Sequence, residues 1–415
     1  MEDWIRVIAD DITSPLGAGS QENWAAVRSG RSCLKLHEGL WELPEPFCAS
    51  MFDRDAVEME CAAENLPHGL TFFEKIALLS ASRAVRAAGI DPSSERVLFV
   101  LSTTKGNVEL LGNAQSYAPQ SYFQGYVQGF ASGRETLHSS ASLIAAHFCN
   151  PNTPVVVSNA CISGLCAQIE AMRALRSGKY DYAVVTGADC LSAFIVSGFQ
   201  SFKALSQQPC RPFDSGRNGL NLGEAAATIV FAAERTASSS SCAETYGTGE
   251  GAALSGNGLG AWMAVSGATR NDANHISGPS RTGEGSFRAL RQVLADACAD
   301  ELAFVNVHGT ATPYNDEMES IAINRAGLSD VPVCGLKGYF GHTLGAAGVL
   351  ETIISMKAAD EGCVPATAGW RESGVSCPVS VSSECRHTDK KAFIKLLSGF
   401  GGCNAAMLFR KGGEI

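Results

Sequence analysis

The feature of this sequence that most constrains its fold is a run of valines that ends at a cysteine among small residues. Val155 to Val157 predict a buried β-strand, and apolar residues recur at helical spacing from Leu165 to Leu175. Cys161 therefore lies between the end of a strand and the start of a helix. Because unpaired N–H groups at a helix N-terminus stabilise negative charge, this position favours the thiolate form of a cysteine. The sequence thus places Cys161 as a nucleophile would be placed.

One cysteine among the fifteen of this chain is by itself weak support for catalysis, because a buried cysteine often serves only as a small apolar side chain. The count is odd, the sequence holds no C-x-x-C pair, and the spacings match no zinc site. Neither a disulfide framework nor a structural metal is therefore expected. We expect reduced thiols, a cytoplasmic location and no metal or other cofactor.

The chain of 415 residues, 45% of them hydrophobic, is long enough for one large layered unit or two similar halves. Its apolar strands run without alternation, which is typical of an α/β protein whose sheets are covered by helices on both faces. The first residues lack an apolar signal region, and no later window offers about 18 uninterrupted apolar residues, so no export signal or membrane span is expected. A net charge of −10 argues against a nucleic-acid partner.

The order of strand, tight turn and small-residue helix occurs twice. The first turn is the one at Cys161, and the second, Phe340 to Gly348, follows a strand predicted at 331–334. A serine-rich segment, Ala233 to Ser241, is the best candidate for a linker between the two copies. We therefore predict an N-terminal half, residues 1–233, and a C-terminal half, residues 234–415, whose two turns face each other.

Other predicted elements bear on the fold. A first strand at 4–9 is expected to close at Asp10 and Asp11, and residues 31–70 look irregular and surface-bound. Thr71 and Glu74 fit a capping box for a helix that Gly89 ends. The remaining expectations are an apolar strand at 97–101, buried parallel strands at 181–189 and 224–231, a helix at 284–299 and a strand at 304–307.

Three more glycine-bounded clusters stand beside the Cys161 turn, at 308–313, 337–342 and 399–404. A single histidine at a strand end is usually structural, but His308 and His342 lie in two of these clusters. In order and spacing the clusters resemble the β-ketoacyl-acyl-carrier-protein synthases of the elongating, two-histidine type, within the thiolase superfamily. The resemblance spans nearly the whole chain. It includes Asp316 and Glu319, which stand 8 and 11 residues beyond His308 in an H-G-T-x-T-P-x-x-D-x-x-E run.

The resemblance implies the thiolase fold, in which two related α/β halves form five layers, α-β-α-β-α, usually in a homodimer with the nucleophile turn near the dimer seam. It also implies a two-stage reaction. An acyl group moves from a carrier-protein thioester to Cys161, and malonyl-carrier protein then loses carbon dioxide so that its carbanion attacks the acyl-enzyme. The implied partners are acyl- and malonyl-loaded acyl carrier protein and a second subunit, identical or a related synthase.

The resemblance also implies roles for single residues. Oxyanions at the thioester are bound by the backbone N–H groups of Cys161 and Phe400. His308 and His342 donate N–H groups to the enolate that decarboxylation forms. Lys337 is implied to be a catalytic residue that is not a nucleophile: paired with Glu351, it helps to set the arrangement of the histidines. The implied gating residues are Phe400, Gly399 and Gly401, and the implied supporting residues are Glu351, Asp316 and Glu319.

Two positions near the nucleophile depart from the family pattern. Ile162 follows Cys161 where the family has a serine, and Ser398 replaces the first phenylalanine of the gating motif. Both changes are expected to reshape the wall of the acyl tunnel, which makes a specialised polyketide or aryl-polyene pathway a credible alternative to housekeeping fatty-acid synthesis. If the tunnel is shaped elsewhere, the aromatic segment Tyr117 to Phe130 is the next candidate.

Two other functions stay open at this point. A non-catalytic partner of another synthase, like a chain-length factor, keeps the fold but generally loses the cysteine, so Cys161 with both histidines favours an enzyme. A thiolase-type condensation with acyl-coenzyme A needs a second cysteine near the C-terminus, which would be Cys403 in the family's threonine position. We therefore predict an acyltransferase, a 3-oxoacyl-[acyl-carrier-protein] synthase of fatty-acid or polyketide biosynthesis.

Overall fold

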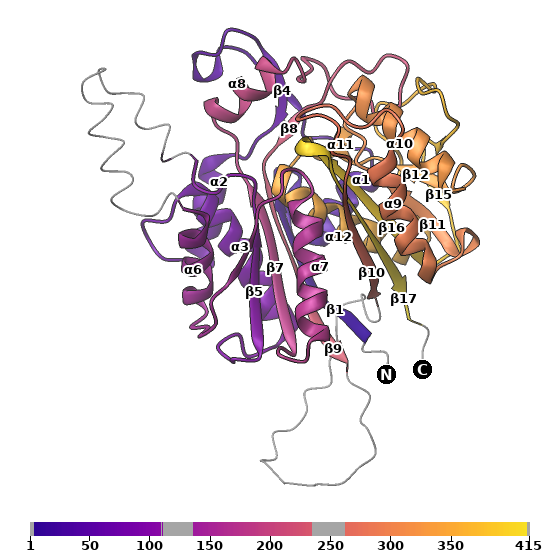
Figure 1. The fold of residues 1–415 in the computed structure, drawn as a ribbon. Coiled ribbons are helices and arrows are strands. Elements are labelled where there is room, and N and C mark those ends of the chain that lie inside the picture. Colours follow the sequence, from indigo (N-terminus) through magenta and orange to yellow (C-terminus); the bar gives the residue numbers. More distant parts are fainter. Residues whose placement is uncertain (1–3, 109, 111–135, 235–261, 413–415) are drawn as a thin grey trace, which may run out of the picture.

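The structure is a computed structural model that describes residues 4–108, 110, 136–234 and 262–412. Figure 1 shows two α/β parts side by side, the N-terminal one in indigo and magenta and the C-terminal one in orange and yellow. Two sequence predictions lie outside the described residues. These are most of the linker, at 235–241, and the aromatic segment Tyr117 to Phe130.

The N-terminal part runs to residue 234 and begins with the longest strand of this part. Its strands are β1 (Trp4–Ser14), β2 (Gly17–Ala18), β3 (Lys35–His37), β4 (Phe47–Ser50), β5 (Val97–Ser102), β6 (Val155–Val157), β7 (Tyr182–Asp189), β8 (Leu222–Gly223) and β9 (Ala225–Glu234). Its helices are α1 (Ser20–Arg28), η1 (Leu40–Glu42), α2 (Arg54–Ala63), α3 (Phe72–Ala88), α6 (Leu137–His147), α7 (Ser163–Arg176) and α8 (Ala193–Ser201).

The C-terminal part begins at residue 262. Its strands are β10 (Trp262–Asn271), β11 (Leu302–Asn306), β12 (Pro332–Cys334), β13 (Cys363–Val364), β14 (Ser380–Val381), β15 (Arg386–His387), β16 (Ala392–Gly399) and β17 (Cys403–Lys411). Its helices are α9 (Glu284–Val293), η3 (Leu294–Asp296), η4 (Ala299–Glu301), α10 (Pro313–Arg325), α11 (Lys337–Phe340), η5 (Leu344–Ala346), α12 (Ala347–Asp360) and η6 (Phe400–Gly402).

The two parts repeat one sheet topology. The strand order is β6-β5-β7-β9-β1 in the first and β12-β11-β16-β17-β10 in the second, with β14 added outside β12. When the five strands of each part are numbered in the order in which they occur along the chain, both parts have the spatial order third, second, fourth, fifth, first. In both, the fifth strand runs antiparallel to its two neighbours, whereas the second strand is parallel to both of its own. The duplication predicted from the sequence is therefore present in the connectivity.

Three apolar cores separate the layers. The central core lies between the two sheets and contains α7 and α12, with Ile169, Ile353 and Phe393 buried in it. One outer core lies between the first sheet and helices α3 and α6, and the other between the second sheet and helix α9, against which α10 packs. The two sheets join where β1 pairs with β10. The layers follow the order helix, sheet, helix, sheet, helix, which is the predicted five-layered thiolase fold.

The first strand is longer than predicted. β1 continues through Asp10 and Asp11 to Ser14. Both carboxylates are buried, but the ammonium of Lys357 lies 3.4 Å from Asp10, and the hydroxyl of Thr13 donates to Asp11 at 3.2 Å. Because these partners offset part of the cost of burying charge, the acidic pair does not end the strand.

Two strands differ from the prediction in their setting. β9 was expected to be parallel, but it is antiparallel to both β7 and β1. A strand buried on both faces has an uninterrupted apolar sequence in either direction, so the pattern alone does not fix its direction. β6 is an edge strand with Val155 36% exposed, not a fully buried strand. Its outer backbone groups have no neighbouring strand within the described residues.

The helix predicted after residue 71 is confirmed. In α3 the side chain of Thr71 accepts from the Glu74 amide, Glu74 accepts from the Thr71 amide, and Gly89 ends the helix with a φ of 63°. The stretch 31–70 is more regular than predicted, because it contains helix α2 and the fully buried strand β4. The helix predicted at 284–299 ends earlier, at Val293, and continues as short 3-10 turns.

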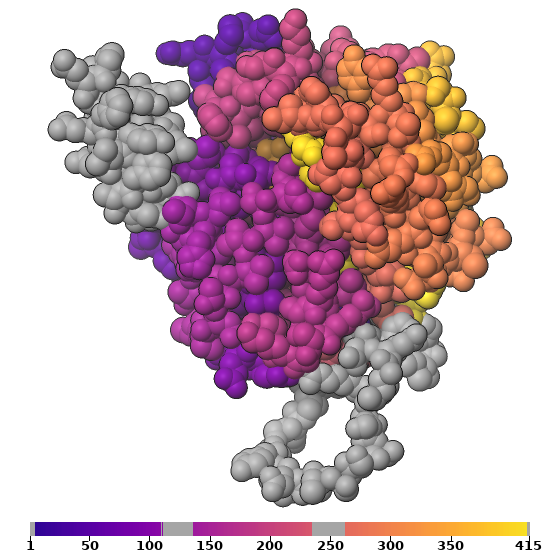
Figure 2. Space-filling model, in the orientation of Figure 1, coloured from indigo at the N-terminus to yellow at the C-terminus, as the bar shows by residue number. Residues whose placement is uncertain are grey.

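Within the ranges that the structure describes, no helix has the length and apolar character needed to cross a membrane. Figure 2 shows the two parts of the chain meeting along a seam on one face, with a small group of yellow atoms from the C-terminal part visible in it.

Candidate active site

Cys161 lies in the tight turn between β6 and α7. Ala160, just before it, has a left-handed backbone with a φ of 46°, a conformation that costs roughly 1–2 kcal/mol for a residue with a side chain. The hydroxyl of Ser163 holds the turn, because it donates to the carbonyl of Ala160 at 2.6 Å and accepts the amide N–H of Asn159 at 2.8 Å. The turn presents a buried sulfur at the start of a helix, at the place that the sequence predicts.

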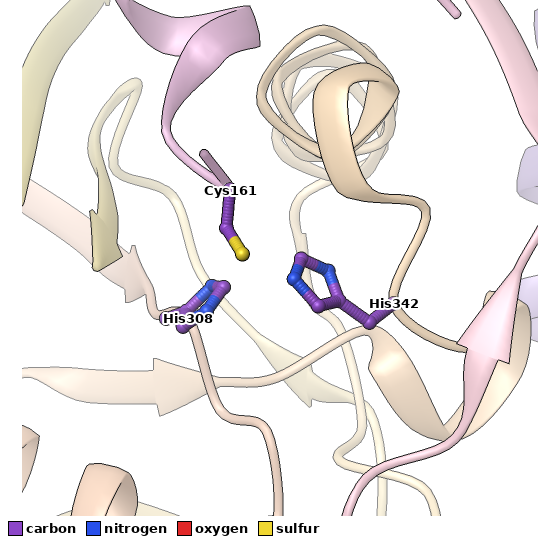
Figure 3. Close-up of side chains that lie close together, drawn as sticks. All are labelled: Cys161, His308 and His342. Carbon is purple, nitrogen blue, oxygen red and sulfur yellow. The ribbon is translucent and has the colours of Figure 1, made fainter. Parts of the chain in front are cut away.

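The structure brings Cys161, His308 and His342 together from segments far apart in the sequence (Figure 3). His308 follows β11 and His342 follows α11. The sulfur and one nitrogen of each ring all lie within 4.8 Å of one another, and all three side chains are buried. The two imidazoles stand edge to face, with ring centroids 5.0 Å apart and planes at 85°. In Figure 3 the sulfur points into the space between the two rings.

Both imidazoles are neutral. Burial, and then the charge of Lys337, hold the pKa of each well below its usual value. The amide N–H of Leu344 donates to Nδ1 of His342 at 3.4 Å, so the proton of this ring is assigned to Nε2. Nε2 of His342 and Nδ1 of His308 are buried without a hydrogen-bond partner in the described part of the chain. Buried polar atoms are normally paired, so these two are available to a substrate.

The sulfur of Cys161 is protonated in the resting chain. Burial, and then the neighbouring Cys403, raise the pKa of the thiol to about 12, although Lys337 and a hydrogen bond from the Phe400 amide act in the opposite direction. Burial therefore outweighs the helix-start effect from which a thiolate was expected. A neutral thiol beside a neutral imidazole can still react as a nucleophile, because the imidazole can accept the thiol proton during the reaction.

A buried charged network lies behind the histidines. The ammonium of Lys337 lies 2.8 Å from Oε1 of Glu351, as the resemblance implies. Lys395, which the sequence analysis missed, donates to the other carboxylate oxygen, Oε2. The signal that could have found it is a lysine in the middle of a run of apolar residues in β16, Ala392 to Leu397.

The two acidic residues beyond His308 hold its loop through backbone amides. Glu319 accepts the N–H groups of His308 at 2.6 Å and Gly309 at 2.7 Å. Asp316 accepts the N–H groups of Phe213 at 2.7 Å and of a residue in the same loop. Burial raises the pKa of Glu319 to about 7 and that of Asp316 to about 6. These contacts fit the supporting role predicted for both residues.

The predicted gating loop connects β16 to β17 beside Cys161. The ring of Phe400 stacks on Phe199, with centroids 5.7 Å apart, and meets Phe202 edge to face at 5.4 Å. A Cβ added to Gly399 would lie 3.2 Å from the amide nitrogen of Cys161, so the loop approaches the Cys161 turn closely only because residue 399 has no side chain. Gly401 has a φ of 81°, which favours glycine.

The two residues predicted to line the tunnel have different surroundings. Ile162 is fully buried in the central core, directly after Cys161. The hydroxyl of Ser398 donates to the side-chain oxygen of Asn404 at 2.9 Å and lies 3.2 Å from the hydroxyl of Ser286 on α9. These contacts favour a role of Ser398 in holding the base of the gating loop, and its role in the tunnel stays a prediction.

Asp189 is a second residue that the sequence analysis missed. Its carboxylate accepts the amide N–H of Gly345 at 2.7 Å and that of Thr104 at 3.0 Å, and the ammonium of Lys105 lies 2.9 Å away. Asp189 thereby ties the turn after His342 to the end of β5. The available signal is an acidic residue at the end of a buried strand, β7.

Among the described residues, one group of side chains has donor atoms close enough together to bind a metal ion. It consists of Cys161, His308 and His342. Zn²⁺ accepts such ligands at about 2.0–2.3 Å. The sequence predicts no metal, and the acyl transfer and decarboxylation that the family resemblance implies need none.

A duplicated five-layered fold with a cysteine turn in its first half and two histidine loops in its second defines the ketosynthase class of the thiolase superfamily. Within that class the chain belongs to the β-ketoacyl synthase family. Residues 2–237 match the model of the family's N-terminal domain and residues 261–371 that of its C-terminal domain. The family predicted from the sequence is therefore confirmed.

Known proteins of this family are similar over most of the chain. Nodulation protein E of Rhizobium meliloti is 30% identical over 350 residues, 81% of either chain, and a putative polyketide beta-ketoacyl synthase 1 of Streptomyces halstedii is 27% identical over 432 residues, 96% of this chain and 95% of the relative. The solved ishigamide ketosynthase/chain length factor has a TM-score of 0.83 at 24% identity, over 100% of both chains. The solved complex of a type II PKS acyl-carrier protein with its ketosynthase has a TM-score of 0.79 at 18% identity, over 99% of this chain and 100% of the other. The solved structures show the shared fold.

Proposed function

We propose that this protein is an active 3-oxoacyl-[acyl-carrier-protein] synthase, which condenses an enzyme-bound acyl group with malonyl-acyl carrier protein. The observation that carries the proposal is the buried cluster of one thiol and two neutral imidazoles, with ring nitrogens that lack a partner among the described residues. A nucleophile and two N–H donors around one space are the parts that acyl transfer and decarboxylation need.

In the first stage Cys161 attacks the thioester carbonyl of the acyl carrier protein. The thiol proton passes to an imidazole, and the new C–S bond forms as the carbonyl oxygen becomes an oxyanion. The backbone N–H groups of Cys161 and Phe400 are the proposed donors to that oxyanion, and the Phe400 amide is already directed at the sulfur. When the tetrahedral intermediate collapses, the carrier thiolate leaves and takes the proton from the imidazole.

In the second stage malonyl-carrier protein occupies the same space. Its carboxylate carbon–carbon bond breaks, carbon dioxide leaves, and the electron pair forms an enolate on the thioester. N–H groups of His308 and His342 stabilise the enolate oxygen, which they can do because both rings are neutral and buried. The enolate carbon then attacks the acyl-cysteine, and the Cys161 sulfur leaves as a thiolate to give the 3-oxoacyl product. One proton taken up from water returns the thiolate to the resting thiol.

The alternative is a non-catalytic partner of another ketosynthase, like a chain-length factor. The ishigamide structure, similar in fold, pairs a ketosynthase with a chain length factor. Cys161, His308 and His342 are all present here and close together, which favours the catalytic role. We expect the reaction to take place in the cytoplasm, where cysteine thiols stay reduced. Fatty-acid or polyketide synthesis, including the aryl-polyene type, remains the proposed pathway.

We propose that a second subunit, identical or a related synthase, pairs along the free edge of β6. Exposed edge strands are templates for pairing with another chain. A cavity of about 420 Å³ lies at this edge, lined by residues 155–159 and the neighbouring face of α7. Ser158 and Asn159, just before the nucleophile, are exposed in the single chain. Pairing here would place the partner beside the Cys161 turn.

The proposed function is tested by incubating the purified protein with acyl- and malonyl-carrier proteins and analysing the carriers by mass spectrometry. A catalytic chain forms 3-oxoacyl-carrier protein, two carbons longer, with one carbon dioxide per product, and Cys161→Ala forms none. A chain that forms no product alone, and instead changes only the product length of another synthase, would be a chain-length factor.

A further inference from the structure

Lys395 is a buried lysine whose ammonium has no access to solvent. It lies in the centre of β16, between Ile394 and Leu396, and its side chain is 0% exposed. An ammonium in such a place is costly unless it is paired and hydrogen-bonded. Every contact of Lys395 is therefore informative, because these contacts stabilise the charge inside the central core.

The contacts of Lys395 lead to both histidine segments. Its Nζ donates to Oε2 of Glu351, whose Oε1 accepts from Lys337 at the start of α11, the helix that precedes His342. One carboxylate on α12 thus joins two lysines from different elements. The network is buried throughout, with the side chains of Lys337 and Glu351 exposed by 1% and 3%.

Lys395 also binds the end of the strand that carries His308. Its Nζ donates to Oδ1 of Asn306 at 2.8 Å and to the carbonyl of Val307 at 3.1 Å. Val307 is the residue immediately before His308, so this bond fixes the peptide from which the imidazole projects. Asn306 is held on its other side by a bond from its Nδ2 to the hydroxyl of Ser355 on α12, at 2.7 Å.

Because both histidine segments are fastened to one carboxylate, Lys395 can set the distance between the two rings. Two donors aimed at one oxygen must be placed within a few tenths of an ångström to stabilise it fully. We propose that Lys395 is a positioning residue for the decarboxylation stage, which holds His308 in register with His342 through Val307, Asn306 and Glu351. The inference rests on the proposed function and adds to it a residue that touches neither substrate nor nucleophile.

The proposal is tested by Lys395→Met, which keeps the volume but removes all donors, and by Lys395→Gln, which keeps a donor without the charge. Because glutamine is uncharged but can still donate, the Gln variant separates the effect of the charge from the effect of the hydrogen bonds. The charge itself is subject to two opposing influences, since burial lowers the pKa of Lys395 and Glu351 acts in the opposite direction. The matched control is Lys357→Met. Lys357 is a different, largely buried lysine, which lies on α12 and pairs with Asp10.

Two rates are measured in each variant: acylation of Cys161, by intact mass, and carbon dioxide release from malonyl-carrier protein by the acylated enzyme. We expect Lys395→Met to lower carbon dioxide release by about 10- to 100-fold, while acylation stays within about threefold. Lys395→Gln is expected to lie between Met and the wild type, and Lys357→Met to leave both rates within about threefold.

Carbon dioxide release within threefold of the wild type in Lys395→Met would overturn the proposal. An equal fall of both rates, together with the melting temperature, would also overturn it, because a purely structural lysine predicts that result. If the Met variant does not fold, the same comparison in Lys395→Gln decides. A wild-type protein that neither becomes acylated nor releases carbon dioxide would instead contradict the proposed function.

Discussion

Substituting Gly399 by alanine tests the geometry of the proposed oxyanion site. The new Cβ would lie 2.9 Å from the Cys403 sulfur and 3.2 Å from the Cys161 amide nitrogen, whereas ordinary contacts begin at 3.4 Å. The loop must therefore move by about 0.5 Å, the difference between 3.4 and 2.9 Å. Backbone strain adds nothing, because the φ of Gly399 is −152°, an extended conformation open to any residue.

The movement displaces the adjacent Phe400 amide from the position that the oxyanion occupies. Complete loss of one such donor costs about 100- to 1,000-fold in rate, and a displaced donor keeps part of its effect. We therefore expect Gly399→Ala to slow acylation of the cysteine by roughly 10- to 100-fold, equivalent to about 1.4–2.7 kcal/mol of transition-state stabilisation. Rapid-quench experiments, in which the reaction is stopped at set times and the protein is analysed by intact mass, measure this rate.

The double variant Gly399→Ala/Cys403→Ala is the matched control. It removes the sulfur that the new methyl group meets first, so part of the lost acylation rate should return. An acylation rate of Gly399→Ala within twofold of the wild type would refute the reasoning, because it would mean that the loop absorbs the methyl group without moving its amide.

Three further predictions concern single groups. Because burial raises the pKa of the Cys161 thiol to about 12, its alkylation by iodoacetamide should keep rising with pH up to about pH 10, whereas a plateau near pH 7 would indicate a resting thiolate. Replacing His308 or His342 by alanine should reduce carbon dioxide release far more than acylation of the cysteine, and a wild-type rate of release in either variant would remove that residue from the mechanism. Burial raises the pKa of Asp11 to about 7, so the folded chain binds a proton that the unfolded chain has lost above about pH 4. The contribution of Asp11 to the free energy of unfolding should therefore fall by on the order of 4 kcal/mol as the pH rises from about 4 to 7. Asp316 and Glu319, whose pKa values burial also raises, add to the same slope. Asp11→Asn should make the slope in urea titrations shallower by the share of Asp11, and an unchanged slope would show that the other groups cause all of it.

The local sequence pattern was enough to predict the parts of the structure that are bounded by glycine and other small residues. The Cys161 turn, the two histidine clusters and the capping box at Thr71 are each marked by residues close together in the sequence, so they could be placed without the fold. The duplication followed for the same reason, since each half repeats a strand, a turn and a helix. The family resemblance then supplied the pairing of Lys337 with Glu351, which the structure contains.

The missed features depend on partners far apart in the sequence. β1 continues through Asp10 because Lys357, almost 350 residues later, lies beside it. Lys395 is stabilised by Glu351 and by the end of β11, and neither is adjacent to it in the chain. The protonation state of Cys161 is set by its burial, which a helix-start argument does not include. In each case the deciding quantity is burial or a long-range contact.

The central claim, that this chain itself carries the acyl group on Cys161, is tested most directly by peptide mapping after incubation with acyl-carrier protein. The mass of one acyl group should appear on the peptide that contains Cys161 in the wild-type protein, and the Cys161→Ala variant should remain unmodified at every residue while keeping its fold. Acylation of another cysteine, or a wild-type protein that stays unmodified while an added synthase becomes acylated, would contradict the account.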